Sequence, residues 1–155
     1  MKRDGKLSGV LHVLLHMAEQ QGPVTSEDLA RMMATNPVVV RRVMAGLRQR
    51  GYVQSEKGHG GGWTLACDLT KVTLGDIYVA LGSPMLLAVG IRSSSPECLV
   101  EQAVNAALGQ AFNDAEELLL ARFGEVTLAE LSKDIHERIA ARGMSQPHEG
   151  HSHGP

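Results

Sequence analysis

The feature that most restricts the fold of this 155-residue chain is a glycine-rich segment, KGHGGGWTLA, at residues 57–66. Four glycines lie between positions 58 and 62, and glycine at this density indicates a backbone that needs unusual torsion angles or a close approach to another group. The flanking residues predict short strands at 52–56 and 62–66, joined by a tip at 57–61. The segment therefore predicts a glycine-tipped β-hairpin, and its neighbours in the chain indicate what the backbone approaches.

Phosphate binding is one role for such a glycine cluster, and the spacing argues against it. After Gly58 and Gly60, the third glycine of a dinucleotide-binding fingerprint falls on Trp63, and no Gly-Lys-Ser/Thr follows. The segment also leads into a strand, so no helix N-terminus faces a ligand. We therefore exclude a nucleotide site here and expect Trp63 to pack the hairpin against the helices.

Two helices are predicted immediately before the hairpin, over residues 26–33 and 37–50. Thr25 with Asp28 resembles a capping box at the start of the first helix. Thr35 or Asn36 can cap the second helix, Pro37 suits its first position, and Gly51 suits its end. Two helices joined by a short turn and followed by a hairpin make a winged helix-turn-helix. In that motif the second helix enters the major groove of DNA, and the hairpin reaches the flanking backbone or the minor groove. Glycines let the wing tip lie against phosphates, with Lys57 and His59 as the side chains that reach DNA.

The rest of the chain reads as helical. Apolar periodicity predicts a first helix over 7–17, and Thr73 with Asp76 begins a short helix that ends near residue 81. Ser95 is expected to cap a long helix of about 26 residues that begins at Pro96, and Thr127 with Glu130 is expected to cap a final short helix. The predicted fold class is mainly α with a small β-hairpin wing: a winged helix-turn-helix domain at 1–82, a connector and long dimerisation helix at 83–142, and a disordered His-rich tail at 143–155.

Charge and composition narrow the class of protein. Residues 1–82 hold ten Lys/Arg and seven Asp/Glu, whereas residues 83–155 hold five and ten, so a polyanion partner suits only the first half. No apolar run approaches the roughly 20 residues that span a bilayer, and the N-terminus lacks a secretory cleavage site. Two cysteines do not make a disulfide framework, so we expect a cytoplasmic protein with no membrane partner. No catalytic constellation of residues appears, which argues against an enzyme.

Four blocks, "TSEDLA", "TNPVVVRRVMAGLRQRGYV", "KGHGGGWTLA" and "VTLGDIYVALG", resemble successive parts of the Rrf/BadM family of bacterial winged-helix regulators. The resemblance is in register over residues 5–82 and continues loosely to about 139. It implies a homodimer whose long helices cross and whose two recognition units meet a palindromic operator. It also implies that Arg41 and Arg42 read bases, that Lys57 enters the minor groove, and that Lys6 and Ser8 contact phosphates.

The chemistry of the recognition helix agrees, because arginine reads guanine O6 and N7 through paired hydrogen bonds. The alternative for Arg41 and Arg42 is a solvated helix face. The candidate contacts to double-stranded DNA are Lys6, Ser8, Asn36, Val38, Arg41, Arg42, Lys57 and His59.

The cysteines bear on how such a regulator senses its effector. Several members of the family carry three cysteines ahead of the long helix that hold an iron–sulfur cluster, whereas "IRSSSPECLVEQAVN" holds one. We therefore expect no cofactor. Cys98, predicted at the third helical position, would have its thiol pKa lowered by unpaired backbone N–H groups, which favours redox or electrophile sensing. Packing alone is the alternative, and a disulfide with Cys67 requires Cα atoms within about 7 Å.

Histidines supply the remaining metal-binding candidates. The tail "HEGHSH" binds divalent metals opportunistically and weakly, so we assign no metal site to it. His12 and His16 lie one turn apart and can share a metal or pack partly buried.

The main hypothesis is a homodimeric repressor that binds half-sites about one helical turn apart. The alternative is a winged-helix protein-interaction or metal-handling protein that does not bind DNA sequence-specifically.

Overall fold

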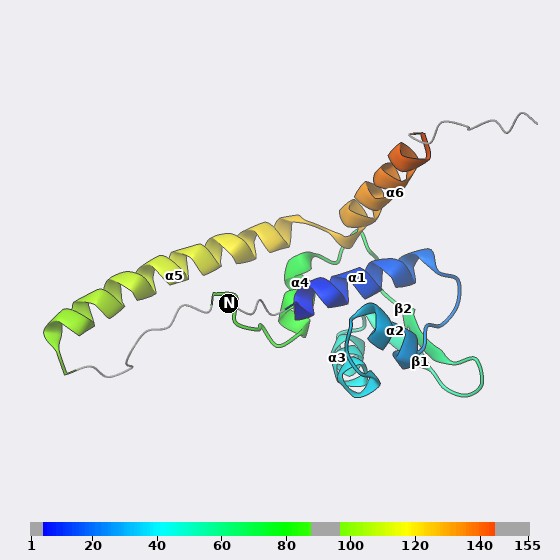
Figure 1. Cartoon of the computed structure of the whole chain (residues 1–155), viewed down its shortest axis with the longest axis horizontal. Helices are drawn as coiled ribbons and strands as arrows, with labels where there is room; N and C mark the ends of the chain where they lie inside the picture. The colour runs from blue at the N-terminus through cyan, green and yellow to red at the C-terminus, as the bar shows by residue number, and fades with distance from the viewer. Residues whose placement is uncertain (1–4, 88–96, 145–155) are drawn as a thin grey trace, which may run out of the picture.

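The computed structural model of the chain describes residues 5–87 and 97–144 and is mainly helical, with one antiparallel hairpin (Figure 1). The predicted fold class is confirmed. In chain order the elements are α1 (Lys6–Glu19), α2 (Ser26–Met32), α3 (Pro37–Gln49), β1 (Val53–Glu56), β2 (Gly62–Leu65), α4 (Leu74–Ala80), α5 (Leu99–Glu125) and α6 (Leu128–Met144). No helix in the described ranges is long and apolar enough to cross a membrane.

Local capping explains why these segments form helices. The Asn36 side chain accepts a hydrogen bond from the backbone N–H of Val39 at 3.1 Å, Pro37 opens α3, and Gly51 follows it with a φ of 78°. Thr73 and Asp76 form a reciprocal capping box at the start of α4. These signals depend on neighbouring residues only, which is why the sequence predicts them well.

The core joins α1, α2, α3, α4 and the hairpin. Its fully buried side chains include Val10, Val13, Leu14, Leu29, Val40, Met44, Leu47, Val53, Ile77 and Leu128. Leu128 stands at the start of α6, so the chain returns to the winged-helix domain after α5. In α3, Val40 takes a fully buried position, whereas its neighbour Val39 is only half-buried.

The hairpin glycines approach the protein's own backbone. A Cβ on Gly61 would lie 2.3 Å from the carbonyl oxygen of Glu56, and one on Gly62 would lie 2.5 Å from that of Val24. Val24 and Trp63 exchange backbone hydrogen bonds of 2.9 and 2.8 Å, which ties β2 to the segment before α2. Two of the four glycines are therefore explained by packing. Gly58 and Gly60 keep positive φ at the tip, with open space around them.

The two C-terminal helices differ from the predicted bounds. The prediction that Cys98 occupies the third helical position is wrong, because α5 begins at Leu99 and Cys98 is its N-cap. Ser95 and Pro96, which the prediction used as cap and first residue, lie outside the described residues. The last helix, α6, has 17 residues and includes positions 143 and 144, which the prediction assigned to the tail. The His-rich segment after Met144 lies outside the described residues as well.

Unlike the winged-helix domain, α5 extends away from the core as a long single helix (Figure 1). Its 27 residues include none that is buried. Near its C-terminal end it contacts the domain, where the Phe123 ring lies 6.1 Å from that of Tyr78 in α4. An isolated antiparallel β-bridge between Thr73, before α4, and Thr127, after α5, lies next to this contact.

Candidate nucleic-acid interface

The outer face of α3 is exposed and carries the two arginines predicted to read bases. Val40, Val43, Met44 and Leu47 bury the opposite face, which leaves Arg41 and Arg42 exposed to solvent. Val38 is 62% exposed in the first turn of the same helix. An apolar side chain so exposed beside two cations is suited to contact with a thymine methyl group. The helix therefore presents groups of the kind that read base edges.

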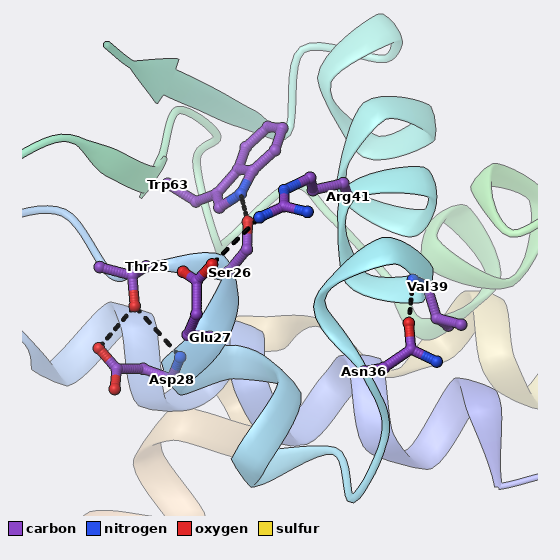
Figure 2. A network of polar contacts seen from close by, with 8 residues as sticks. All are labelled: Thr25, Ser26, Glu27, Asp28, Asn36, Val39, Arg41 and Trp63. Carbon is purple, nitrogen blue, oxygen red and sulfur yellow. Dashed lines mark hydrogen bonds and ion pairs between the residues drawn. The ribbon is translucent and has the colours of Figure 1, made fainter. Parts of the chain in front are cut away.

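Arg41 is ion-paired across the helix-turn-helix. Its Nη2 atom lies 3.1 Å from Oε1 of Glu27, which stands in the first turn of α2 (Figure 2). The side chains remain 56% and 60% exposed, respectively. Arg42, by contrast, has no ion pair with any of the described residues. In the absence of DNA, Arg41 is therefore ion-paired, whereas Arg42 has no such pair among the described residues.

The wing is anchored to the helix-turn-helix by its tryptophan. Trp63 is buried, as predicted, and its indole Nε1–H donates to Oγ of Ser26 at 3.0 Å (Figure 2). From α3, the Arg48 guanidinium lies 6.0 Å from the centre of the Trp63 ring and donates to Oγ of Ser55 in β1 at 3.2 Å. These contacts hold the hairpin beside α3, so recognition helix and wing are positioned together.

The remaining predicted contacts occupy three separate places. Lys57 and His59 are exposed at the tip of the wing. Lys6 and Ser8 lie in the first turn of α1, where Lys6 is half-buried and Ser8 exposed. The Asn36 side chain caps α3 through its oxygen, which leaves its amide N–H groups as the donors toward a ligand.

Sequence reasoning missed Glu27, Ser26 and Arg48. Glu27 lies 14 positions before Arg41, and Trp63 lies 37 positions after Ser26. No periodicity or capping pattern links residues at such separations. A charged residue in the first turn of a helix predicts only a favourable dipole interaction, so nothing in the sequence indicated this pairing.

The two cysteines have opposite environments. Cys98 is exposed, and hydrogen bonding from the backbone of Glu101 and then of Val100 lowers the pKa of its thiol. Cys67, after β2, is half-buried, and burial raises the pKa of its thiol. Both thiols are free. The predicted effect on Cys98 thus arises at the N-cap rather than inside the first turn.

Histidines on α1 form a close pair. The Nε2 atoms of His12 and His16 lie 2.9 Å apart, and both side chains are exposed rather than packed. Within the described ranges, no three His, Cys, Asp or Glu residues gather into a group that could hold a metal ion.

A known protein family matches most of the chain. The family model named Rrf2, described as an iron-dependent transcriptional regulator, matches residues 4–134. The chain belongs to the Rrf2 family. It is a helix-turn-helix transcriptional regulator and not an enzyme, and regulators of this family bind DNA.

Relatives and solved structures agree with the Rrf2 assignment. Protein rrf2 of Nitratidesulfovibrio vulgaris is 27% identical over 125 residues, which cover 81% of this chain and 80% of the relative. A proposed transcriptional regulator from Lactobacillus plantarum has a similar structure, with a TM-score of 0.70, 24% identity, and coverage of 93% of this chain and 100% of that one. IscR of T. potens follows, with a TM-score of 0.64, 20% identity, and coverage of 95% and 94%. At these identities the structures establish the shared fold.

The description of the Rrf2 family implies iron, and the described residues of this chain do not fit an iron site made within one chain. Iron–sulfur clusters are held mostly by thiolates, usually four. The two thiols here are one half-buried cysteine after the wing and one exposed cysteine at the start of α5. No group of three donors lies around either of them in the described part of the chain.

Proposed function

We propose that this Rrf2-family chain is a cytoplasmic, homodimeric repressor that binds an imperfect inverted repeat in double-stranded DNA. In each half-site α3 enters the major groove, where Arg41 and Arg42 read base edges, with Val38 and Asn36 beside them. Lys57 and His59 at the wing tip reach the adjacent minor groove or backbone, and Lys6 and Ser8 contact phosphates. The observation that carries this proposal is the exposed arginine face of α3 beside a wing that Trp63 anchors to the same domain.

Dimerisation is proposed through α5. Its exposed apolar side chains include Leu99, Val100, Val104, Leu108, Leu118 and Leu120. Exposed apolar area of this extent usually marks an interaction surface, and a second copy of the same helix is self-complementary. Two winged-helix domains joined in this way suit half-sites centred about one helical turn apart.

Regulation is proposed through the thiol of Cys98. The backbone N–H groups at the start of α5 lower the pKa of its thiol, and the side chain is exposed at the start of the proposed dimerisation helix. Oxidation or alkylation there alters the proposed dimer and hence DNA binding. Replacing Cys98 with serine is expected to remove oxidant-dependent DNA release, whereas replacing Cys67 with serine should preserve it. An unchanged oxidant response in Cys98→Ser removes thiol sensing from the proposal.

The test begins with selection of bound DNA from random fragments, using reduced and oxidised protein in parallel. With the selected operator, Arg41→Ala is expected to relax specificity at one base position, by about 1–3 kcal/mol. Lys57→Ala should weaken binding to all fragments and reduce the salt dependence by about one unit of slope. Arg138→Ala, on the exposed surface of α6, is the matched control and should change neither.

The alternative is a winged-helix protein-interaction or metal-handling protein without sequence-specific DNA binding. It is favoured if Arg41→Ala and Lys57→Ala both shift operator fragments as the unmodified protein does. It also follows if selection recovers no common sequence.

A further inference from the structure

The ion pair between Glu27 and Arg41 connects the two helices of the helix-turn-helix. Glu27 lies in the first turn of α2 and Arg41 in the second turn of α3, with 3.1 Å between Oε1 and Nη2. In Figure 2 the arginine side chain leaves α3 and points toward the first turn of α2, where the carboxylate meets it. The guanidinium proposed to read a base is therefore already oriented by an acid from the other helix.

The backbone that carries Glu27 is held on both sides. Thr25 caps α2 by accepting a hydrogen bond from the backbone N–H of Asp28 at 3.1 Å. Ser26, next to Glu27, is buried and accepts the indole N–H of Trp63 at 3.0 Å (Figure 2). The backbones of Val24 and Trp63 are joined by two hydrogen bonds. The wing thus fixes the position of the first turn of α2, which carries Glu27.

The pairing matters because an arginine side chain is long and loses rotamer freedom when it binds a base. Guanidinium has five N–H donors in a planar fork, so one contact to Glu27 leaves donors available for a base edge. Orienting the fork before DNA arrives reduces the entropy lost on correct binding. The Glu27 carboxylate also repels phosphates, which disfavours binding wherever Arg41 has no matching base.

We propose that Glu27 is a positioning residue that sets how strictly the operator is discriminated through Arg41. The inference rests on the proposed function, in which Arg41 reads a base. It concerns recognition rather than folding, because an ion pair between two exposed side chains contributes little to stability.

The test uses the full-length protein and two DNA fragments, measured by fluorescence anisotropy at one fixed salt concentration. One fragment is the selected operator, and the other differs at the base pair where Arg41→Ala relaxes selection. Glu27→Gln keeps the shape of the side chain and removes its charge. The ratio of the two dissociation constants is expected to fall about three- to tenfold in Glu27→Gln, since coupled residues typically show interaction energies of this order.

Glu56→Gln is the matched control for charge. Glu56 is an exposed acid at the end of β1 in the wing, and its carboxylate forms no ion pair with any of the described residues. Removing either negative charge should tighten binding to DNA in general. Only Glu27→Gln should change the ratio between the two fragments. Equal ratios in Glu27→Gln and Glu56→Gln overturn the inference.

The double variant completes the test. If Glu27 acts through Arg41, Glu27→Gln in the Arg41→Ala background should leave the ratio where Arg41→Ala alone put it. A further fall in the double variant contradicts action through Arg41. If Arg41→Ala relaxes selection while Glu27→Gln does not, only the inference about Glu27 fails. If Arg41→Ala relaxes nothing, the base-reading role in the proposed function fails, and the inference fails with it.

Discussion

The winged-helix domain and α5 differ in how far their apolar side chains are buried. In the domain, apolar residues from α1, α2, α3, α4 and both strands converge on one core, and many of them are fully buried. In α5, the longest helix among the described residues, no side chain is buried. The same residue types, leucine and valine, thus have partners within the chain in one region and face solvent in the other.

This contrast separates what stabilises the fold from what is available for assembly. A core closed within one chain supports the domain by itself, because burial of apolar area is the main favourable contribution to folding. The apolar residues of α5 contribute little until another surface covers them. The corner around Phe123 and Leu128 attaches the helix to the domain. Each prediction below tests one side of this contrast.

The largest effect is expected in the core. Leu47→Ala removes a side chain with no exposed area from the last turn of α3. The resulting cavity should lower the free energy of unfolding by about 2–5 kcal/mol. Leu118→Ala in α5, where Leu118 is 61% exposed, should change it by less than about 1 kcal/mol in dilute protein. Urea unfolding followed by circular dichroism measures both, and similar losses would contradict the contrast.

The next effect concerns the wing, where backbone packing replaces side-chain packing. Gly62→Ala places a methyl group 2.5 Å from the carbonyl oxygen of Val24, so the wing must shift away from the segment before α2. We expect a loss of about 2 kcal/mol, within the range for strained backbone positions. Gly58→Ala meets open space and bears only the cost of its positive φ, about 1 kcal/mol. Thermal unfolding of both variants checks the order, and a larger loss in Gly58→Ala would overturn this explanation.

A smaller free-energy change is expected at the exposed surface of α5. Val104→Asp introduces a charge among apolar residues proposed to face a second copy. The dissociation constant of the dimer should rise at least about tenfold, equivalent to about 1.4 kcal/mol, because charged residues are depleted at interface centres. Asn113→Asp adds the same charge at an exposed polar position and is the control. Sedimentation equilibrium gives the constants; if both variants associate like the unmodified protein, α5 is not the interface.

The smallest effect is expected in the alkylation rates of the two thiols, one from each region. The pKa of Cys98, at the start of α5, is lowered, and that of Cys67, in the winged-helix domain, is raised. A lowered pKa means more of the reactive thiolate at a given pH, so at pH near 8 Cys98 should be alkylated several-fold faster. Its rate should also level off at a lower pH than that of Cys67. Iodoacetamide labelling of Cys67→Ser and Cys98→Ser, each with one thiol, provides the rates, and equal pH profiles would contradict the assignment.

Local signals in the sequence predicted the elements well. The helix starts at Ser26, Pro37 and Leu74 follow from capping residues a few positions away, and the strands follow from alternation around the glycines. Predictions at two other helix boundaries were less accurate, one of them despite an apparent cap at Ser95. The start of α5 moved to Leu99, and α6 continues to Met144. Helix ends fray and shift by small free energies, so tertiary contacts can move them.

The candidate site divides in the same way. The sequence identified Arg41 and Arg42 as cations on the outer side of a recognition helix, since periodicity alone separates the buried face of α3 from the exposed face. It did not indicate that Arg41 would be paired and Arg42 would not. That difference depends on where the first turn of α2 lies relative to α3, and this placement requires the folded backbone.

By itself, the sequence determined the order of helices, the glycine-tipped hairpin and the chemical character of the groups that face outward, because each depends on interactions between residues close together in the chain. Only the tertiary structure decided that Gly61 and Gly62 accommodate the protein's own backbone, that Trp63 ties the wing to Ser26, and that Glu27 meets Arg41. These contacts join distant positions, and they form only when burial of the shared core brings those positions together.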